Sequence, residues 1–189
     1  MKITLVRHGE SEGNVAGIIN DDPARPVALT ATGRGQALAL GDELRAAPFV
    51  QAYASQFARA HQTAVMLLGD RCLYLEIDAR LNERRSGMDG RPVEDFNALV
   101  RADPVDAMPP AGESFRQQME RMRGCLDDLA ARHGDAAVLA VSHENPILAA
   151  CALAGMAPAD AARASIPNCG RVVIEWNGGN GRVIAGPAL

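Results

Sequence analysis

The sequence predicts a single-domain α/β protein: a three-layer α/β/α sandwich with a mostly parallel central sheet and a small cap segment. Strand-like runs alternate with helical segments along the chain, as in layered α/β folds. One of these runs, Ala136 to Val141, is apolar throughout, as expected of a strand buried on both faces. With 189 residues, of which 48% are hydrophobic and 22% charged, the chain suits one domain with a substantial core.

The segments follow in order from patterning and breaker residues. Ile3 to Val6 predicts a first strand that ends at Arg7, followed by a polar loop to Pro26. The remaining expected strands are 50–54, 72–77 and 136–141, with a terminal hairpin at 171–176 and 182–185. The expected helices are 30–46, 58–68, 114–132 and 146–153. Residues 84–110 are interrupted by Gly and Pro and predict a cap-like insertion within the single domain, residues 1–189.

Charge and composition narrow the classes of partner. The net charge of −4 and the lack of a basic stripe argue against nucleic acid and anionic membranes as partners. No apolar run reaches the length of a membrane span, and the first run is too short for a signal peptide, so we expect a cytoplasmic protein. The four cysteines, at positions 72, 125, 151 and 169, form no CxxC pair. Free thiols in a reducing cytosol are therefore preferred, although disulfides stay possible, and the histidines show no metal-ligand spacing.

Arg7-His8-Gly9 directly follows the first predicted strand, where α/β sheets bind ligands. A guanidinium can grip phosphate oxygens, and a neutral imidazole nitrogen can attack phosphorus. Gly9 would let the backbone turn closely around a ligand. By itself, this motif could equally be an ordinary turn at a strand end.

Further motifs follow in order: Leu29-Thr30-Ala31-Thr32-Gly33 with Gln36-Ala37, then Ser55 to Ala64 with Arg59, Leu81-Asn82-Glu83, Gly112-Glu113-Ser114 and Val141-Ser142-His143. Together with Arg7-His8-Gly9, they resemble the histidine phosphatase (phosphoglycerate-mutase-like) superfamily over nearly the whole chain. The resemblance implies that His8 is the nucleophile, that Glu83 is the acid and that His143 is the second catalytic histidine. It also implies that Arg7, Arg59 and Asn14 bind the phosphate. Because the sequence shows no metal-ligand spacing and the arginines can offset the phosphate charge, we expect no metal or cofactor to take part.

These roles have physical reasons. Arg7, Arg59 and a protonated His143 could offset the charge of a phosphate group, while His8 must stay neutral, held by a hydrogen bond to a backbone carbonyl. Glu83 would protonate the leaving oxygen and later activate water. Glu83 could instead pair with Arg84 or Arg85 on a solvated loop, and Asn14 could be a plain turn residue.

Two departures from the family pattern stand out. Glu144 follows the second histidine, where the family commonly has glycine, and we expect it to point away from phosphate or to meet a cation such as Arg171. The loop 20–27 lacks the Thr-Gly-Trp pattern of the mutases. Arg25, Arg84 and Arg85 could contact substrate, but solvated surface positions are preferred for them.

The sequence therefore predicts a metal-independent phosphatase that hydrolyses small phosphomonoesters through a phosphohistidine intermediate. One alternative is a cofactor-dependent phosphoglycerate mutase, although the short segment between Glu83 and Ser114 favours access of water to the site. The other alternative is a phospho-ligand-binding protein without catalysis, for which the nucleophile and the acid would be needless. The sequence leaves the physiological substrate and the oligomeric state open.

Overall fold

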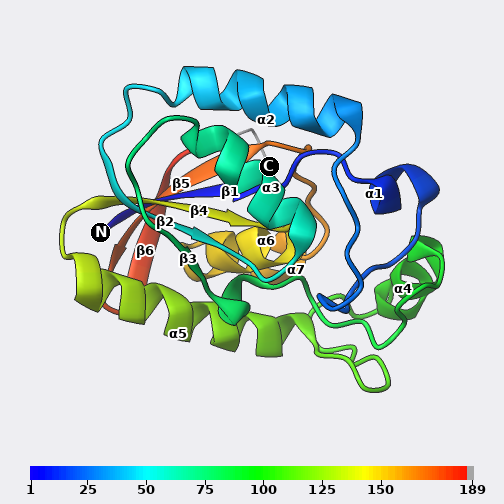
Figure 1. Ribbon diagram of the computed structural model, residues 1–189. Helices are drawn as coiled ribbons and strands as arrows, with labels where there is room; N and C mark the ends of the chain where they lie inside the picture. The colour runs from blue at the N-terminus through cyan, green and yellow to red at the C-terminus, as the bar shows by residue number, and fades with distance from the viewer. Residues whose placement is uncertain (187–189) are drawn as a thin grey trace.

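Six strands form one sheet in the order β3-β2-β4-β1-β5-β6 in the computed structural model, which describes residues 1–186 (Figure 1). The strands are β1 (Lys2–Arg7), β2 (Phe49–Ala54), β3 (Leu75–Ile77), β4 (Ala137–Ser142), β5 (Arg171–Asn177) and β6 (Asn180–Ala185). The first four run parallel to one another, β5 lies antiparallel to β1, and β6 lies antiparallel to β5. The predicted mostly parallel sheet with a terminal hairpin is confirmed.

Helices cover both faces of the sheet, which confirms the predicted three layers (Figure 1). The helices are α1 (Glu12–Ala16), α2 (Ala31–Glu43), α3 (Ala58–Leu68), α4 (Val93–Val100), α5 (Phe115–His133), α6 (Glu144–Leu153) and α7 (Pro158–Ala161), with a 3-10 turn, η1, at Ala79–Leu81. The α2 and α3 helices lie on one face, and α5 and α6 lie on the other. No helix within residues 1–186 is both long and apolar enough to cross a membrane.

The β4 strand is buried on both faces, as its apolar run predicts. Val138 and Ala140 belong to the core beneath α5 and α6, whereas Leu139 and Val141 belong to the core beneath α2 and α3. None of the four is more than 1% exposed. This two-sided burial fixes the register of β4, and with it the position of the residues that follow the strand.

Several boundaries differ from the prediction. The helix α6 begins at Glu144 rather than Pro146, with His143 at its N-cap position. The strand β3 covers only Leu75–Ile77 of the predicted run 72–77, because it pairs with β2 over three residues at the edge of the sheet. The short helices α1, α4 and α7 were not predicted, since each lies in a stretch broken by Gly or Pro.

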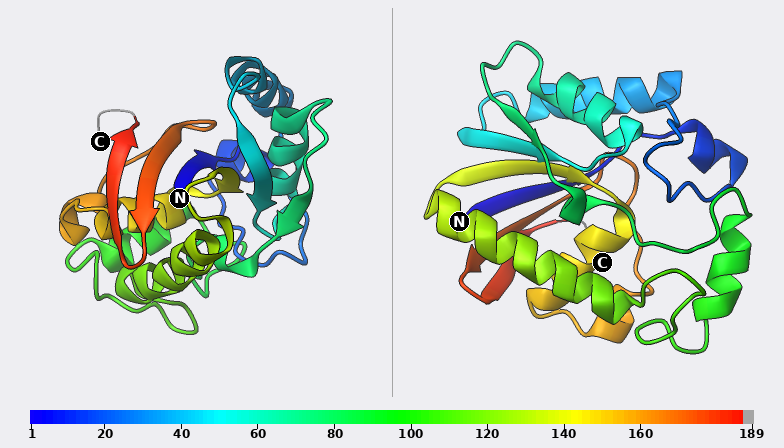
Figure 2. Two further views of the ribbon diagram at one scale, coloured as in Figure 1. Left: turned by 90° about the vertical axis from the view of Figure 1, so that its left-hand side faces the viewer. Right: turned by 60° about the horizontal axis from the view of Figure 1, so that its bottom comes forward.

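The expected cap segment, residues 84–110, contains α4 and lies with α1 beyond the carboxyl ends of the parallel strands (Figure 2). It is tied to the loop that follows β1. Asp21 Oδ2 accepts hydrogen bonds from the backbone amides of Ser86 at 2.8 Å and Gly87 at 2.9 Å, and Ile18 forms an isolated bridge with Pro92. Two segments distant in the sequence thus lie against each other beside the strand ends.

Candidate active site

Strand pairing brings the two predicted catalytic histidines together. Arg7 ends β1 and lies in register with Ser142, which ends β4. His8 and His143 follow these two residues, and their ring centroids are 5.0 Å apart. The ligand-binding edge expected for a parallel sheet therefore carries the two histidines.

His8 is buried, and both of its ring nitrogens have partners. Nδ1 lies 2.7 Å from the Gly9 carbonyl oxygen, and Arg59 Nε donates to Nε2 at 3.1 Å. Burial, and next the positive charge of Arg59, hold the pKa of His8 well below its usual value of 6.5. The imidazole is therefore neutral near pH 7, with its proton on Nδ1 and a lone pair on Nε2. The expected backbone-carbonyl partner is confirmed.

Gly9 has a packing role that was not predicted from the sequence. A Cβ atom at Gly9 would lie 2.5 Å from the Gly33 carbonyl oxygen, and a Cβ at Gly33 would lie 2.0 Å from that of Glu10. The backbone after β1 therefore packs directly against the start of α2. These glycines allow two backbones to approach, whereas the sequence suggested an approach to ligand.

One nitrogen of the Arg7 guanidinium group, Nη1, is held by two hydrogen bonds. Nη1 donates to Glu144 Oε1 at 2.8 Å and also to the Ile166 carbonyl oxygen. Nε is buried and has no hydrogen-bond partner among residues 1–186. A buried donor without a partner is costly, so this nitrogen is free for an anionic ligand.

Arg59 extends from α3 toward His8 and is held by the loop after β1. Nη1 donates to Asn20 Oδ1 at 2.5 Å, and Nη2 donates to the Asn20 carbonyl oxygen at 3.2 Å. Burial lowers the pKa of Arg59 to about 10, with Glu83 opposing this shift and Arg7 adding to it. Arg59 therefore keeps its charge at neutral pH, as the predicted phosphate-binding role requires.

His143 is fully buried, and its surroundings oppose the expected cation. Burial lowers its pKa well below 6.5, and the charge of Arg59 adds to the effect, so His143 is neutral near pH 7 in this structure. Ser55 Oγ lies 2.7 Å from Nε2 and accepts from the Phe57 amide at 3.3 Å, which leaves the serine hydroxyl proton free to donate to Nε2. His143 then carries its proton on Nδ1, which is buried without a partner in the described chain.

Glu83 follows η1 and lines the same pocket as His8. Its Oε1 accepts from the backbone amide of Arg84 at 2.8 Å. Burial raises the pKa of Glu83 and the charge of Glu144 acts in the same direction, while the Arg84 amide and the charge of Arg59 act against it. In residues 1–186, Glu83 forms no ion pair with the side chains of Arg84 or Arg85. The geometry therefore does not support the alternative in which Glu83 pairs with one of these arginines on a solvated loop.

Asn14 has a local structural role and also lies at the pocket. Its Oδ1 accepts from the Ser11 amide and hydroxyl, both at 3.0 Å, and completes the capping box of α1. It also lines the pocket, and Asn168 Nδ2 donates to its Oδ1 at 3.3 Å. The side-chain oxygen is therefore committed to local structure.

The residues that hold the predicted ones in place were not predicted from the sequence. Asn168 Nδ2 donates to the His8 carbonyl oxygen at 3.0 Å, Asn20 anchors Arg59, and Ser55 orients His143. Ser55 lies in the motif that contains Arg59, so that motif was an available signal. Asn168 is 160 residues from His8 and carries no local signal beyond its place just before β5.

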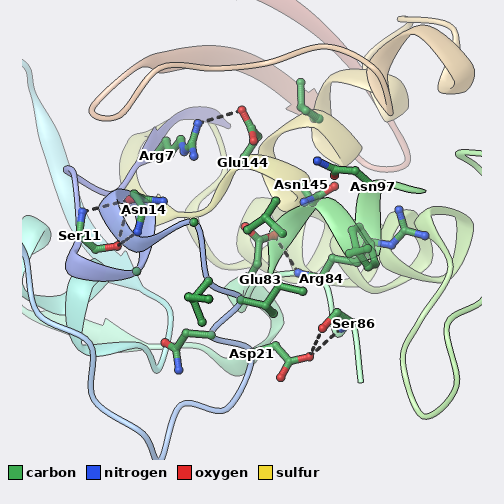
Figure 3. A pocket seen from close by; sticks show the side chains of 18 of the residues that line it. Arg7, Ser11, Asn14, Asp21, Glu83, Arg84, Ser86, Asn97, Glu144 and Asn145 are labelled. Atoms are coloured by element: carbon green, nitrogen blue, oxygen red, sulfur yellow. Dashed lines mark hydrogen bonds and ion pairs between the residues drawn. The ribbon is translucent and has the colours of Figure 1, made fainter. Parts of the chain in front are cut away.

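Glu144 meets a cation, as expected, but the cation is Arg7 and not Arg171. Glu144 pairs with Arg7, whereas Arg171 pairs with Glu43 at 2.6 Å. Figure 3 shows the Glu144 side chain joined to Arg7 at the edge of the pocket. The carboxylate meets a cation, as expected, but that cation is one of the two predicted phosphate-binding arginines.

The three arginines left open by the sequence have different surroundings. Arg25 is exposed and pairs with Asp89, and Arg85 is also exposed, as preferred. Arg84, by contrast, is 4% exposed, and burial lowers its pKa to about 10. Its Nε and Nη2 donate to the carbonyl oxygens of Glu113 and Ala107, so Arg84 fixes the cap segment rather than facing solvent.

A pocket of about 770 Å³ joins these groups to the cap segment (Figure 3). Arg7, His8, Arg59 and Glu83 line one part of it, and residues of α4 line another. Within residues 1–186, no three His, Cys, Asp or Glu side chains are grouped so that they could hold a metal ion.

Comparison with known proteins agrees with this geometry. Residues 3–185 match the model of the histidine phosphatase superfamily, branch 1. The chain is 34% identical over 153 residues to the adenosylcobalamin/alpha-ribazole phosphatase of Salmonella typhimurium, covering 76% of this chain and 74% of the relative. It is 31% identical over 170 residues to phosphoserine phosphatase 1 of Hydrogenobacter thermophilus, covering 82% and 77%.

The fold comparison leads to the same family. The crystal structure of the alpha-ribazole phosphatase from Shigella flexneri superimposes with a TM-score of 0.85 at 26% identity, covering 100% of this chain and 96% of that one. The chain therefore belongs to the histidine phosphatase superfamily, branch 1, and is a phosphatase of that family.

Proposed function

We propose that the protein hydrolyses small phosphomonoesters through a phosphohistidine formed on His8, without a metal ion. The observation that carries the proposal is the state of His8. Its Nδ1 proton is held by the Gly9 carbonyl, and its lowered pKa keeps the imidazole neutral at neutral pH. Its Nε2 lone pair accepts a hydrogen bond from Arg59 Nε, which would turn to a phosphoryl oxygen when substrate binds and so free the lone pair for attack.

In the first step, His8 Nε2 forms a bond to phosphorus as the bond from phosphorus to the ester oxygen breaks. Glu83 gives its proton to the departing oxygen, so that an alcohol leaves. The raised pKa of Glu83 keeps a larger fraction of this carboxyl group protonated than in an ordinary glutamate. Such a proton transfer typically contributes roughly 10²–10⁴ in rate.

In the second step, the Glu83 carboxylate takes a proton from water, and the water oxygen forms a bond to phosphorus. The bond between phosphorus and His8 Nε2 breaks, and inorganic phosphate leaves. The histidine and the carboxyl group return to their first protonation states, so the cycle closes without another reactant.

Four groups would offset the charge on the phosphoryl oxygens. Arg7 through its unpartnered Nε and Arg59 supply positive charge, His143 would donate through Nδ1–H, and Asn14 would donate through its amide nitrogen. Because two guanidinium groups already supply what a metal ion would, the proposal needs no metal.

The surroundings complete the proposal. Residues 84–110 would act as a cap over the substrate within the one domain. All four cysteines are free; Cys125 and Cys151 are buried, Cys169 is partly buried and Cys72 is exposed. Free thiols fit a reducing compartment such as the cytoplasm.

The test separates the phosphatase from its two rivals. The purified protein is given 3-phosphoglycerate with 2,3-bisphosphoglycerate as primer, and phosphate release and isomerisation are measured together, with and without chelator. We expect phosphate release from several phosphomonoesters in both conditions, with little 2-phosphoglycerate. Isomerisation that outruns phosphate release would establish the mutase, and binding without turnover would establish a phospho-ligand-binding protein. Loss of activity on chelation, with restoration by magnesium or zinc, would refute metal independence.

A further inference from the structure

The α4 helix turns an apolar face to the pocket instead of to the core. Val93, Phe96 and Val100 recur at helical spacing and all line the pocket, while no residue of α4 is buried. The charged side chains of this segment pair with one another, Glu94 with Arg101 and Asp95 with Arg91, and Arg101 also lines the pocket. An apolar helix face that no part of the core covers is an expected place for an apolar ligand group.

Apolar side chains from two other elements line the same cavity. Ile18 and Ile19 come from the loop after β1, and Leu148 comes from α6. The cavity is continuous with the phosphate end, because Arg7, His8 and Arg59 line it too. We call the apolar side chains named above, from α4, α6 and the loop after β1, the apolar wall. A molecule held by its phosphate at His8 would therefore extend its organic part along the apolar wall.

The size of the cavity also indicates a larger organic group. Its volume of about 770 Å³ lies within the range, roughly 300–1,000 Å³, of sites that enclose drug-sized ligands. A phosphate with a two- or three-carbon chain would leave most of this volume to water. The apolar lining would then gain nothing from burial.

The wall is held in place before any ligand binds. The Arg84 guanidinium lies over the Phe96 ring, 5.0 Å from its centroid, and is itself fixed by the two backbone carbonyls described above. Asn97 and Asn145 add neutral hydrogen-bonding groups from α4 and α6 (Figure 3). Arg101 and Arg163 also line the pocket, so charged groups border the apolar surface. A preformed apolar surface of this kind suits the hydrocarbon part of an organic moiety.

We propose that the preferred substrates are monophosphate esters of alcohols that carry an aromatic ring or a branched hydrocarbon, which contacts Phe96, Val93 and Ile18. This inference rests on the phosphatase activity proposed above and specifies the substrate class of that site. It excludes esters of small polar acids, such as glycerate, as the best substrates.

The experiment compares ethyl phosphate with 3-phenylpropyl phosphate. Both esters release a primary alcohol, so Glu83 protonates the same kind of leaving group in each. The difference in kcat/KM between them therefore reports binding of the organic group. We expect kcat/KM to be at least tenfold higher for the phenylpropyl ester, chiefly through a lower KM. A factor of about ten is the order of magnitude that burial of a phenyl ring contributes to binding. A wild-type ratio below tenfold, or faster turnover of 3-phosphoglycerate than of the phenylpropyl ester, overturns the inference.

Variants locate the effect on α4. Phe96→Ala should lower the ratio of the two kcat/KM values at least fivefold, by loss of the ring contact. Val93→Ser, at a position that is 40% exposed and outside the core, should lower it in the same direction if Phe96→Ala fails to fold. Leu99→Ala is the matched control, because Leu99 lies on the same helix but does not line the pocket, and it should leave the ratio unchanged. A ratio unaffected by both pocket variants overturns the inference.

Binding separates this inference from the proposed activity. Dissociation constants of the two esters are measured by calorimetry on His8→Ala, where turnover does not interfere. Tighter binding of the phenylpropyl ester by tenfold supports the apolar wall even if the wild type releases no phosphate, which would refute only the phosphatase proposal. Equal dissociation constants, with phosphate released by the wild type, refute only the apolar wall.

Discussion

Glu144 Oε1 accepts three hydrogen bonds: from Arg7 Nη1 at 2.8 Å, from Ser165 Oγ at 2.7 Å and from the Ile166 amide at 2.9 Å. The residue that departs from the family pattern thus links the end of β1, the start of α6 and the loop before β5. The Glu144 carboxylate holds Nη1 of Arg7, whereas Nε of Arg7 has no hydrogen-bond partner in the described residues. Glu144 therefore orients Arg7 while placing a negative charge near the phosphate site.

Two variants of Glu144 separate these effects. Glu144→Gln keeps the accepting oxygen but removes the charge, so we expect vanadate and phosphate to inhibit about three- to tenfold more strongly. Glu144→Ala removes the anchor as well, and kcat/KM should fall about tenfold because Arg7 is no longer held. Glu43→Gln, which breaks the distant pair with Arg171, is the control. Identical behaviour of the Gln and Ala variants would show that the carboxylate does not orient Arg7.

The acid role of Glu83 predicts a dependence on the leaving group. Glu83→Gln should slow alkyl phosphates by roughly 10²-fold or more and p-nitrophenyl phosphate far less, since an activated phenolate needs little protonation. Steady-state kcat/KM values for the two esters measure this. An equal loss on both would assign Glu83 a structural role.

The same groups set the dependence of activity on pH. His8 must be neutral, so activity falls as pH drops through its lowered pKa, below 6.5. Glu83 must be protonated, so activity on alkyl esters falls as pH rises through its raised pKa, above 4.5. The pH profile of activity for the wild type is divided by that of Glu83→Gln. Because ionisation of the substrate affects both profiles equally, it cancels in the quotient. The quotient should decline on the alkaline side, and a flat quotient would contradict the assignment.

The buried histidines also predict a loss of stability in acid. His143 has a lowered pKa in the folded protein, so its contribution to stability is fully present above 6.5 and is lost as pH falls below it. Between pH 7 and 5 the free energy of unfolding should fall by about 1–2 kcal/mol for each such histidine. Urea unfolding of His143→Gln should show a smaller fall than the wild type. Replacement of His61, exposed on α3, is the control. An unchanged fall in His143→Gln would contradict the lowered pKa.

The contact between the loop after β1 and α2 can be tested with two glycines of one helix. Gly33→Ala places a Cβ against the Glu10 backbone and should cost about 2 kcal/mol or more, with a loss of activity as the nucleophile loop shifts. Gly35→Ala meets no atom within 4 Å and should stabilise the protein by about 0.5–1 kcal/mol. Thermal unfolding of the pair measures the difference. Equal stability of the two variants would show that the approach is not tight.

The sequence predicted those features that local patterning determines. The apolar run in β4 and the capping Ser114 of α5 placed these elements well, because burial and capping act within a few residues. The partners of Arg84 and Glu144 could not be predicted. Both side chains bind groups more than twenty residues away, and the alternatives, solvent for Arg84 and Arg171 for Glu144, were locally just as reasonable.

Trapping the phosphoryl-enzyme shows which residue carries the phosphoryl group. The protein is mixed with a ³²P-labelled phosphomonoester, quenched in base within milliseconds and mapped by peptide analysis. We expect one acid-labile, base-stable adduct on His8, which is absent from His8→Ala and decays as phosphate appears. A label on serine or aspartate, or turnover by His8→Ala at the wild-type rate, would contradict it.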